Sequence, residues 1–316
     1  MISLLASLSV LLPILLSVAF ITLIERKWLA ATQRRVGPNA VGLWGLLQPF
    51  ADALKLLAKE CVVPSHASKV LFYVSPVITL VFSLLGWTVL PLSSGSSLLE
   101  SNLSILLSLA LSSLGIYGVL LAGWSANSKY ALLGSLRSTA QIVSYELIYG
   151  SSVLCVVLIH GTFNYNEIVD QQSLWTIVPL LPVSFIYWVS ALAETNRAPI
   201  DLPEAESEFV AGFFTEHSSV PFVIFFLAEY GSLVLISAIT CLLFLGGYPV
   251  IINPLLAGTI LGLKTTFICL CFVWVRATLP RLRYDTLIEL CWTDLLPAAI
   301  AFVLLVPSLL VAFEAY

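Results

Sequence analysis

The chain has 316 residues, of which 59% are hydrophobic and 10% are charged, and its mean hydropathy is +1.01. Soluble domains are about 45–50% apolar and about 25% charged, so this composition excludes an ordinary soluble protein and a disordered chain. Acidic residues (18) outnumber basic residues (14), which argues against a nucleic-acid-binding protein.

The apolar residues gather in long runs. The first run begins at residue 2 with no basic region before it, so we expect it to stay as a membrane helix and not to act as a cleaved signal. A membrane helix needs about 20 mostly apolar residues. Eight runs are of this kind: 2–24, 70–90, 103–124, 138–160, 174–193, 219–246, 254–275 and 290–313. They do not alternate as the strands of a membrane barrel do. The sequence predicts a single all-α membrane domain over residues 1–316.

The loops between these runs differ in charge. Loops 1, 3, 5 and 7, with their helix edges, carry 13 of the 14 basic residues, whereas loops 2, 4 and 6 carry none. Basic loops stay on the cytoplasmic or matrix side of a membrane. We therefore expect the odd-numbered loops on that side, which we call the odd-loop side, and both termini on the other, even-loop side.

Loop 1 also contains an amphipathic segment. Gln48, Asp52, Lys55 and Lys59 recur every three or four residues between apolar residues. This spacing predicts a helix that lies in the membrane interface, because it is too short and too charged to span.

Loop 5 reverses the charge of its own side. Against Arg197 stand six acidic residues, namely Glu194, Asp201, Glu204, Glu206, Glu208 and Glu216. Crowded carboxylates repel one another and retain protons more readily, so the loop is suited to proton relay. Pro199 and Pro203 prevent a regular helix, so we expect a structured, non-helical loop. The alternative is a solvated acidic loop.

Three ionisable residues lie inside apolar runs. Glu146, Glu229 and Lys264 are each about 15 Å from the end of their run, at 1.5 Å per residue. Charges near the middle of a bilayer are costly and usually mark ion or proton pathways. The alternative is a buried Glu–Lys pair that only holds helices together.

Arginines and aromatic residues gather at the odd-loop ends of the first and seventh runs. Arg26, Arg34, Arg276 and Arg281 lie near tryptophans and a tyrosine, in a pattern that could orient a polar head group whose tail enters an apolar slot. Taken alone, the same residues also fit a topological anchor with an aromatic belt. Nucleotide-binding motifs, CxxC pairs of cysteines and histidine clusters are absent from the sequence, so we expect no metal and no nucleotide on this chain.

Five segments give the chain a resemblance to the NADH dehydrogenase subunit 1 family, the membrane heel of respiratory complex I. They read ERKWLAATQRRVGPN at 25–39, LQPFADALKL at 47–56, LRSTAQIVSYE at 136–146, AETNRAPIDL at 193–202 and RATLPRLRYD at 276–285. The resemblance covers nearly the whole chain, and the segment at 193–202 is the most diagnostic.

The resemblance implies a core membrane subunit of proton-pumping NADH:ubiquinone oxidoreductase. Members of this family hold the entrance of the ubiquinone tunnel, where the peripheral arm joins, and begin an acidic path into the membrane arm. Flavin and iron–sulfur clusters belong to partner subunits, and none is expected on this chain. Carried onto this sequence, the quinone passage comprises Arg26, Arg34, Asp52, Arg276 and Arg281. The proton path comprises Glu146, Glu194, Arg197, Asp201, Glu204, Glu206, Glu208, Glu229 and, from its depth, Lys264.

The resemblance also implies partners and a location. We expect peripheral quinone-module subunits at the odd-loop side, small and antiporter-like subunits in the membrane, bound lipids and no nucleic acid. High hydropathy and a single methionine favour the mitochondrial inner membrane, and a bacterial plasma membrane is the alternative. This chain departs from the usual family pattern at Ala205, Phe214, His217 and Thr293.

Three other functions are consistent with parts of the pattern. A membrane-bound hydrogenase has a related anchor subunit that serves no quinone. A secondary transporter uses charges near the bilayer midplane, and would work without partners. A non-catalytic scaffold would tolerate neutral residues at Glu204, Glu206 and Glu208.

Overall fold

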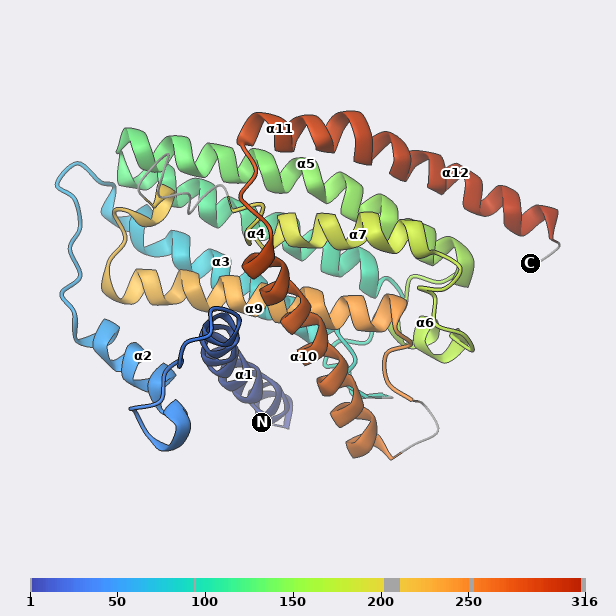
Figure 1. The fold of residues 1–316 in the computed structure, drawn as a ribbon, viewed down its shortest axis with the longest axis horizontal. Helices are drawn as coiled ribbons and strands as arrows, with labels where there is room; N and C mark the ends of the chain where they lie inside the picture. The colour runs from blue at the N-terminus through green and yellow to red at the C-terminus, as the bar shows by residue number, and fades with distance from the viewer. Residues whose placement is uncertain (1, 94, 202–210, 250–252, 314–316) are drawn as a thin grey trace.

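The protein is described by a computed structural model, which covers residues 2–93, 95–201, 211–249 and 253–313. Every regular element in these ranges is helical (Figure 1). The helices are α1 (Ile2–Thr32), α2 (Gln48–Ala58), α3 (Lys69–Val89), α4 (Ser104–Ala126), α5 (Lys129–His160), α6 (Tyr165–Gln171), α7 (Leu181–Glu194), α9 (Ser219–Phe244), α10 (Pro254–Thr278), α11 (Tyr284–Glu289) and α12 (Leu296–Ala312). Short helical turns, η1 (Leu43–Gly45), η2 (Gly212–Phe214) and η3 (Leu290–Leu295), complete the list. The all-α membrane fold is confirmed.

Seven of the eight predicted spans are long apolar helices within the described residues. The predicted span 174–193 is wrong in length, because residues 174–180 are not helical and the helix there, α7, has 14 residues. Pro179 and Pro182 explain the difference. Proline disfavours helix in the residue before it, and Pro182 occupies the first turn of α7. At 1.5 Å per residue α7 is about 21 Å long, shorter than the hydrocarbon core.

Two other boundaries also differ from the sequence prediction. Helix α5 begins at Lys129, nine residues before the predicted start, so Arg137 lies inside it. Helices α11 and α12 are joined by the π-helical turn η3, and together the three form one apolar span, Tyr284–Ala312. The predicted amphipathic helix of loop 1 is present as α2, in which no residue is buried and Leu54 and Leu57 are exposed, and its place in the membrane interface stays a prediction.

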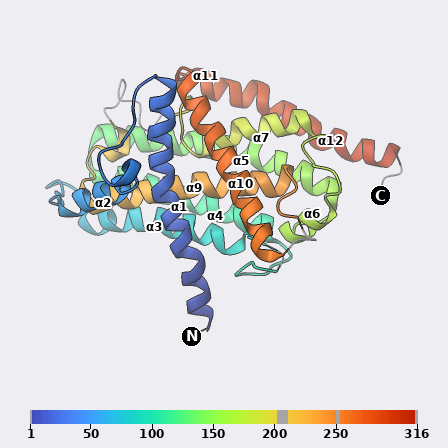
Figure 2. The same cartoon turned by 60° about the horizontal axis from the view of Figure 1, so that its bottom comes forward.

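Helices α3, α4, α5, α7 and α9 run alongside one another, and α10 crosses α9 obliquely (Figure 1). Helix α1 packs against α9 and α10, and its N-terminal part projects away from the rest (Figure 2). Small residues allow the closest approaches. A side chain at Gly118 would meet the Thr79 Cγ2 atom at 2.3 Å, so α4 can lie this close to α3 only with glycine there.

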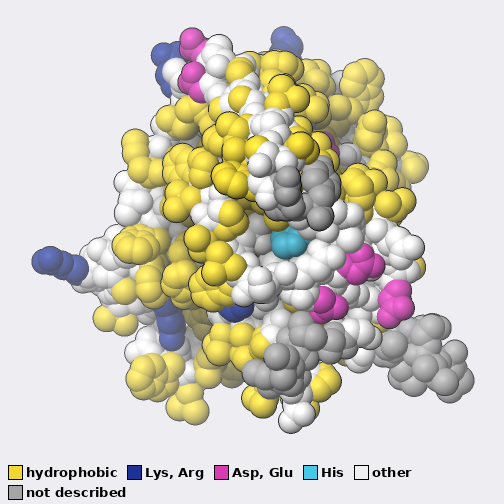
Figure 3. All heavy atoms as spheres, turned by 90° about the vertical axis from the view of Figure 1, so that its right-hand side faces the viewer, with side chains coloured by type: hydrophobic (Ala, Val, Ile, Leu, Met, Phe, Trp, Pro, Cys, Tyr) yellow, Lys and Arg dark blue, Asp and Glu magenta, His cyan; other side chains and the backbone are white. Residues whose placement is uncertain are grey.

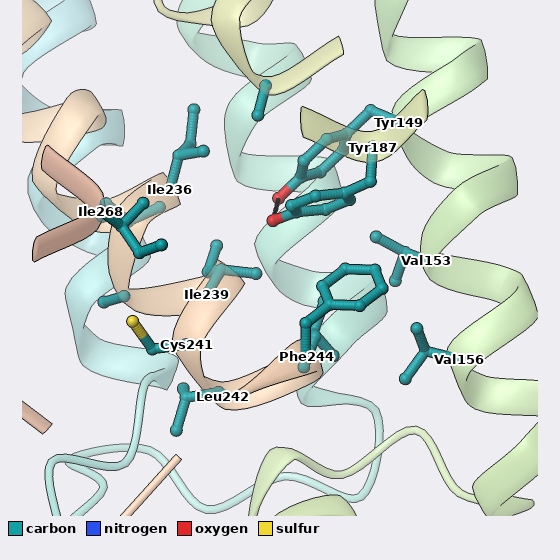
Figure 4. Packing of buried hydrophobic residues seen from close by; sticks show 14 of the residues in the cluster. Tyr149, Val153, Val156, Tyr187, Ile236, Ile239, Cys241, Leu242, Phe244 and Ile268 are labelled. Carbon is teal, nitrogen blue, oxygen red and sulfur yellow. Dashed lines mark hydrogen bonds between the residues drawn. The ribbon is translucent and has the colours of Figure 1, made fainter. Parts of the chain in front are cut away.

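The core is centred between α5, α7 and α9. The rings of Tyr149 and Tyr187 stack with centroids 5.0 Å apart, and Phe244 packs against Tyr187 at 4.8 Å (Figure 4). The two hydroxyl groups face each other at 3.4 Å, so the polar ends of these rings meet inside the apolar core. We call the end of the bundle where α5 ends, α6 lies and α7 begins the even-loop end.

Candidate functional site

The centre of the site is the carboxylate of Glu25, which is 3% exposed on α1. Arg197 donates through Nη1 to both of its oxygens, at 2.9 and 3.0 Å. Arg276 of α10 donates to Oε1 at 2.5 Å, and the Tyr230 hydroxyl of α9 donates to Oε2 at 2.7 Å. Four parts of the chain therefore meet at one buried carboxylate.

A second carboxylate extends this group. The Nε atom of Arg197 lies 3.1 Å from Oε1 of Glu229, and its guanidinium lies 4.1 Å from the centre of the Tyr230 ring. We call Glu25, Arg197, Tyr230, Glu229 and Arg276 the ionic cluster. Its two acids and two arginines balance, which is the condition under which buried charges are tolerated.

The charge on Arg197 is held firmly. Burial acts to lower the pKa of Arg197, but Glu229, Tyr230 and Glu25 together outweigh it and raise the pKa above its already high value. The guanidinium therefore stays protonated, and proton exchange in the cluster is left to its carboxylates.

The loop that carries Arg197 is fixed by a side chain of α5. The Nε2 atom of Gln141 donates to the carbonyl oxygens of Ala193 and Ile200, both at 2.9 Å. The amide of Leu282 donates to the Pro199 carbonyl at 3.0 Å, which ties the same loop to the segment after α10. Residues 194–201 are thus a structured segment, as the sequence predicted for this part of loop 5.

An acidic cavity of about 150 Å³ adjoins the cluster. Helices α3, α4, α5 and α9 and the end of α7 line it, mostly with apolar side chains and serines. Glu229 and Glu194 both face this cavity. The Ser113 hydroxyl donates to Glu146 next to it, and Glu146 and Glu194 interact electrostatically. Glu229, Glu194 and Glu146, all predicted for the proton path, therefore lie in or beside the same cavity.

The residues predicted to line the quinone passage do not all lie together. Arg276 belongs to the ionic cluster, and Arg281 lies 3.5 Å from the buried Asp201. Arg26 pairs with Asp52 of α2 at 2.5 Å, and Gln48 donates to the same carboxylate at 3.0 Å. Arg34 is exposed just after α1, with a left-handed backbone. Arg26 and Asp52 are partly exposed on the outer face of α1 and α2.

Lys264 lies apart from the acids. Its Nζ donates to the carbonyl oxygens of Leu245 and Gly247, at 2.7 and 2.8 Å, and lies 5.5 Å from the Trp175 ring. These carbonyls belong to the turn that follows α9, and Gln172 donates to the carbonyls of Leu242 and Leu243 in the last turn of the helix. A cation here compensates the negative end of a helix dipole. Lys264 therefore stabilises the end of α9, and the role in proton transfer expected for it stays a prediction.

Some predicted positions fall elsewhere. Glu204, Ala205, Glu206 and Glu208 lie outside the described residues. Phe214 packs in an aromatic cluster with Phe213, Phe222 and Phe225. His217 stacks on Phe72 with ring centroids 4.1 Å apart, and Thr293 lies in the π-helical turn, where its hydroxyl donates to the Glu289 carbonyl. In the described part of the chain, His, Cys, Asp and Glu do not form a group that could hold a metal.

Sequence reasoning missed two members of the cluster, Glu25 and Tyr230. A signal existed for each: Glu25 directly follows the first apolar run, and Tyr230 follows Glu229. A charge that closes an apolar run ordinarily indicates a helix end facing water, whereas the structure buries this one.

Comparison with known proteins agrees with this architecture. The sequence model of the NADH dehydrogenase family matches residues 5–307. NADH-ubiquinone oxidoreductase chain 1 of Mycosarcoma maydis is 61% identical, over 99% of this chain and 97% of its own length. The chain 1 protein of Candida albicans is 50% identical over 96% and 94%, and a subunit of the NADH-quinone oxidoreductase of Rhodospirillum centenum is 48% identical over 97% and 93%. The chain therefore belongs to the NADH dehydrogenase subunit 1 family, a family of membrane chains of the complex I oxidoreductase.

Proposed function

We propose that this chain couples ubiquinone reduction to proton movement in an inner-membrane NADH:ubiquinone oxidoreductase. Ubiquinone is the substrate, and flavin and iron–sulfur clusters are held by partner subunits at the odd-loop side. The observation that carries the proposal is the shared carboxylate of Glu25. It binds Arg276 from the expected quinone passage and Arg197 from the expected proton path at the same time.

The cluster can act as an electrostatic relay. Reduction of a quinone beside Arg276 and Arg281 places negative charge in the passage and attracts Arg276, which then binds Glu25 less strongly. Glu25, with one cation withdrawn, attracts Arg197 away from Glu229. Glu229 faces the acidic cavity and restores the balance of charge by taking up a proton. Glu194 and Glu146 then provide the next acceptors toward neighbouring membrane subunits.

The alternatives are less favoured by the same observations. A secondary transporter working alone gives no reason for Arg276 of the passage to share the Glu25 carboxylate with Arg197, which also pairs with Glu229 at the cavity. The relatives named above are all quinone oxidoreductase chains, and none of those names describes a hydrogenase. A scaffold gives no reason for acids deep in the membrane to gather at one cavity.

The test is Glu229→Gln in the assembled complex. We expect a loss of at least ten-fold in coupled quinone reduction together with a lower ratio of protons pumped to electrons transferred, because the relay loses its first proton acceptor. Glu100→Gln, an exposed acid in an even-numbered loop, is the matched control and should leave both quantities unchanged. A Glu229→Gln complex that reduces quinone and pumps at the native rate would contradict the proposal.

A further inference from the structure

The two ends of the acidic cavity are lined by different kinds of side chain. Along α4 its wall runs from Ser108 to Val119, about 16 Å at 1.5 Å per residue. At the Val119 end the wall is aromatic, with Phe213 and Phe225. At the Ser108 end, which is the even-loop end, it finishes on a hydroxyl group.

The segment before α6 is fastened over this polar end. The Ile105 amide and the Ser104 hydroxyl both donate to the Phe163 carbonyl, at 3.1 Å each. The Tyr165 amide donates to the Ser104 oxygen at 3.0 Å. The hydroxyl groups of Ser108 and Tyr165 lie 2.7 Å apart. Hydrogen bonds thus hold the Tyr165 ring directly behind the cavity wall.

Tyr165 stands between the cavity and the even-loop surface. Its side chain is 2% exposed, and it begins α6, on which Glu167 and Asp170 are exposed. The even-loop end, seen in Figure 3, shows acidic side chains and a histidine on a mostly uncharged face. One aromatic ring and one short helix therefore separate Ser108 from surface acids that could exchange protons with water.

The chemistry of the Tyr165 side chain suits a barrier to protons. Burial raises the pKa of Tyr165 well above its usual value, against the opposing effect of the Ser108 hydrogen bond, so the hydroxyl stays neutral at physiological pH. Its hydroxyl lies 2.7 Å from the Ser108 oxygen, and Ser108 itself donates to the Ile105 carbonyl at 2.8 Å, so the two hydroxyl groups bind each other and the α4 backbone.

We propose that the Ser108–Tyr165 contact is a proton seal, which closes the acidic cavity at the even-loop end and prevents protons at Glu194 from crossing the membrane there. The inference rests on the proposed function, because a seal is needed only where the cavity holds mobile protons. If the Tyr165 ring excludes water, it interrupts the proton path. If the hydroxyl groups of Ser108 and Tyr165 instead pass a proton from one to the other, the same two residues form an exit. The experiment separates these two roles.

The experiment uses the purified complex in liposomes. The passive decay of an imposed pH gradient is measured without NADH, and the ratio of protons pumped to electrons transferred is measured with it. Tyr165→Ala removes the ring, and we expect the gradient to decay at least five-fold faster while electron transfer in the presence of an uncoupler stays within two-fold. Tyr165→Phe keeps the ring, and we expect near-native tightness and pumping. Tyr165→Thr, which removes the ring but keeps a hydroxyl, replaces Tyr165→Ala if that complex does not assemble.

Tyr248→Ala is the matched control. Tyr248 is buried at the same end, but its hydroxyl donates at 2.9 Å to Asn166, which does not line the cavity, whereas the partner of Tyr165 is the lining residue Ser108. We expect liposomes with this variant to stay tight. Adding Glu194→Gln to Tyr165→Ala should abolish the leak, because the leak passes through the cavity.

Two results would overturn the seal. One is a Tyr165→Ala or Tyr165→Thr complex as tight as the unmodified one. The other is a tight Tyr165→Phe complex that no longer pumps, which would make the hydroxyl an exit. Failure of the proposed function is recognised separately, by a Glu194→Gln complex that pumps normally, because the passive leak needs no turnover.

Discussion

Glu25 and Arg26 are neighbours in the chain, yet the structure places them in opposite environments. The Glu25 side chain is 4% exposed and is bound by two arginines and a tyrosine. The Arg26 side chain is 53% exposed and pairs with Asp52, itself 35% exposed. Successive residues on a helix point about 100° apart, so one step along α1 moves a charge from the core to the surface.

The two pairs also differ in what they can do. A buried ion pair is strongly destabilised when one partner is removed, because the other charge is left without compensation in a medium of low dielectric. An exposed pair is screened by water and salt and contributes little to stability. The buried cluster can therefore transmit a change of charge from one partner to the next, whereas the outer pair can guide or orient a ligand without being coupled to the interior.

The largest effect on stability is expected for a substitution in the buried cluster. Glu25→Ala leaves Arg197 and Arg276 facing each other with Glu229 as the remaining acid, and should destabilise the protein by about 3–5 kcal/mol. The amount of assembled complex on a native gel measures the effect. Arg26→Ala is the control from the adjacent position and should assemble normally. Normal assembly of Glu25→Ala would show that the cluster contributes little to stability.

A buried and an exposed histidine, His217 and His66, extend this comparison to the dependence of stability on pH. Burial against Phe72 and Phe225 lowers the pKa of His217 to about 4, partly opposed by the Ala122 carbonyl, whereas His66 is exposed. The unfolded chain binds a proton near pH 6.5 and the folded chain does not, so stability is complete above that pH and is lost as the pH falls from 6.5 to 4.

At pH 5 the loss should be about 2 kcal/mol relative to pH 7, at about 1.4 kcal/mol per pKa unit. Thermal dissociation of the complex at several pH values measures it. His217→Phe should flatten the dependence and His66→Phe should not. An equal acid sensitivity in native and His217→Phe complexes would exclude this histidine as the cause.

The fold could be predicted from sequence more fully than the site. Long apolar runs have few alternatives to membrane helices, so their number and type followed from hydropathy alone. The exception is α7, where Pro179 and Pro182 interrupt an apolar run that hydropathy treats as continuous. Glu146 and Glu229 could be identified because a deep carboxylate is rare, and Glu194 because acidic residues crowd in loop 5.

Their partners could not be identified in the same way. Glu25 is separated from Arg197 by 172 residues, from Tyr230 by 205 and from Arg276 by 251. No local spacing shows that these residues meet. Depth alone was also ambiguous for Lys264, since it did not reveal that the turn after α9, whose carbonyl oxygens accept from this lysine, lies beside it.

Lys264 extends the comparison to a partly buried cation whose partners are carbonyl oxygens. Lys264→Met should cost about 1–2 kcal/mol, because the carbonyls of the turn after α9 lose their donor. A purely structural role predicts a lower temperature of dissociation with an unchanged ratio of protons to electrons. Lys69→Met, at an exposed lysine, is the control. A reduced ratio at native stability would instead support a role of Lys264 in the proton path.

The smallest effect is expected for the outer pair. Asp52→Asn removes the charge that binds Arg26 while keeping the shape of the side chain and an oxygen that can still accept from Gln48. Stability should change by less than about 1 kcal/mol. If the pair orients quinone at the passage, the KM for ubiquinone should rise two- to five-fold with little change in kcat, and the difference should shrink at high salt, because exposed charges are screened. A fall in kcat at unchanged KM would instead connect Asp52 with the buried cluster, and the separation between the two regions would no longer hold.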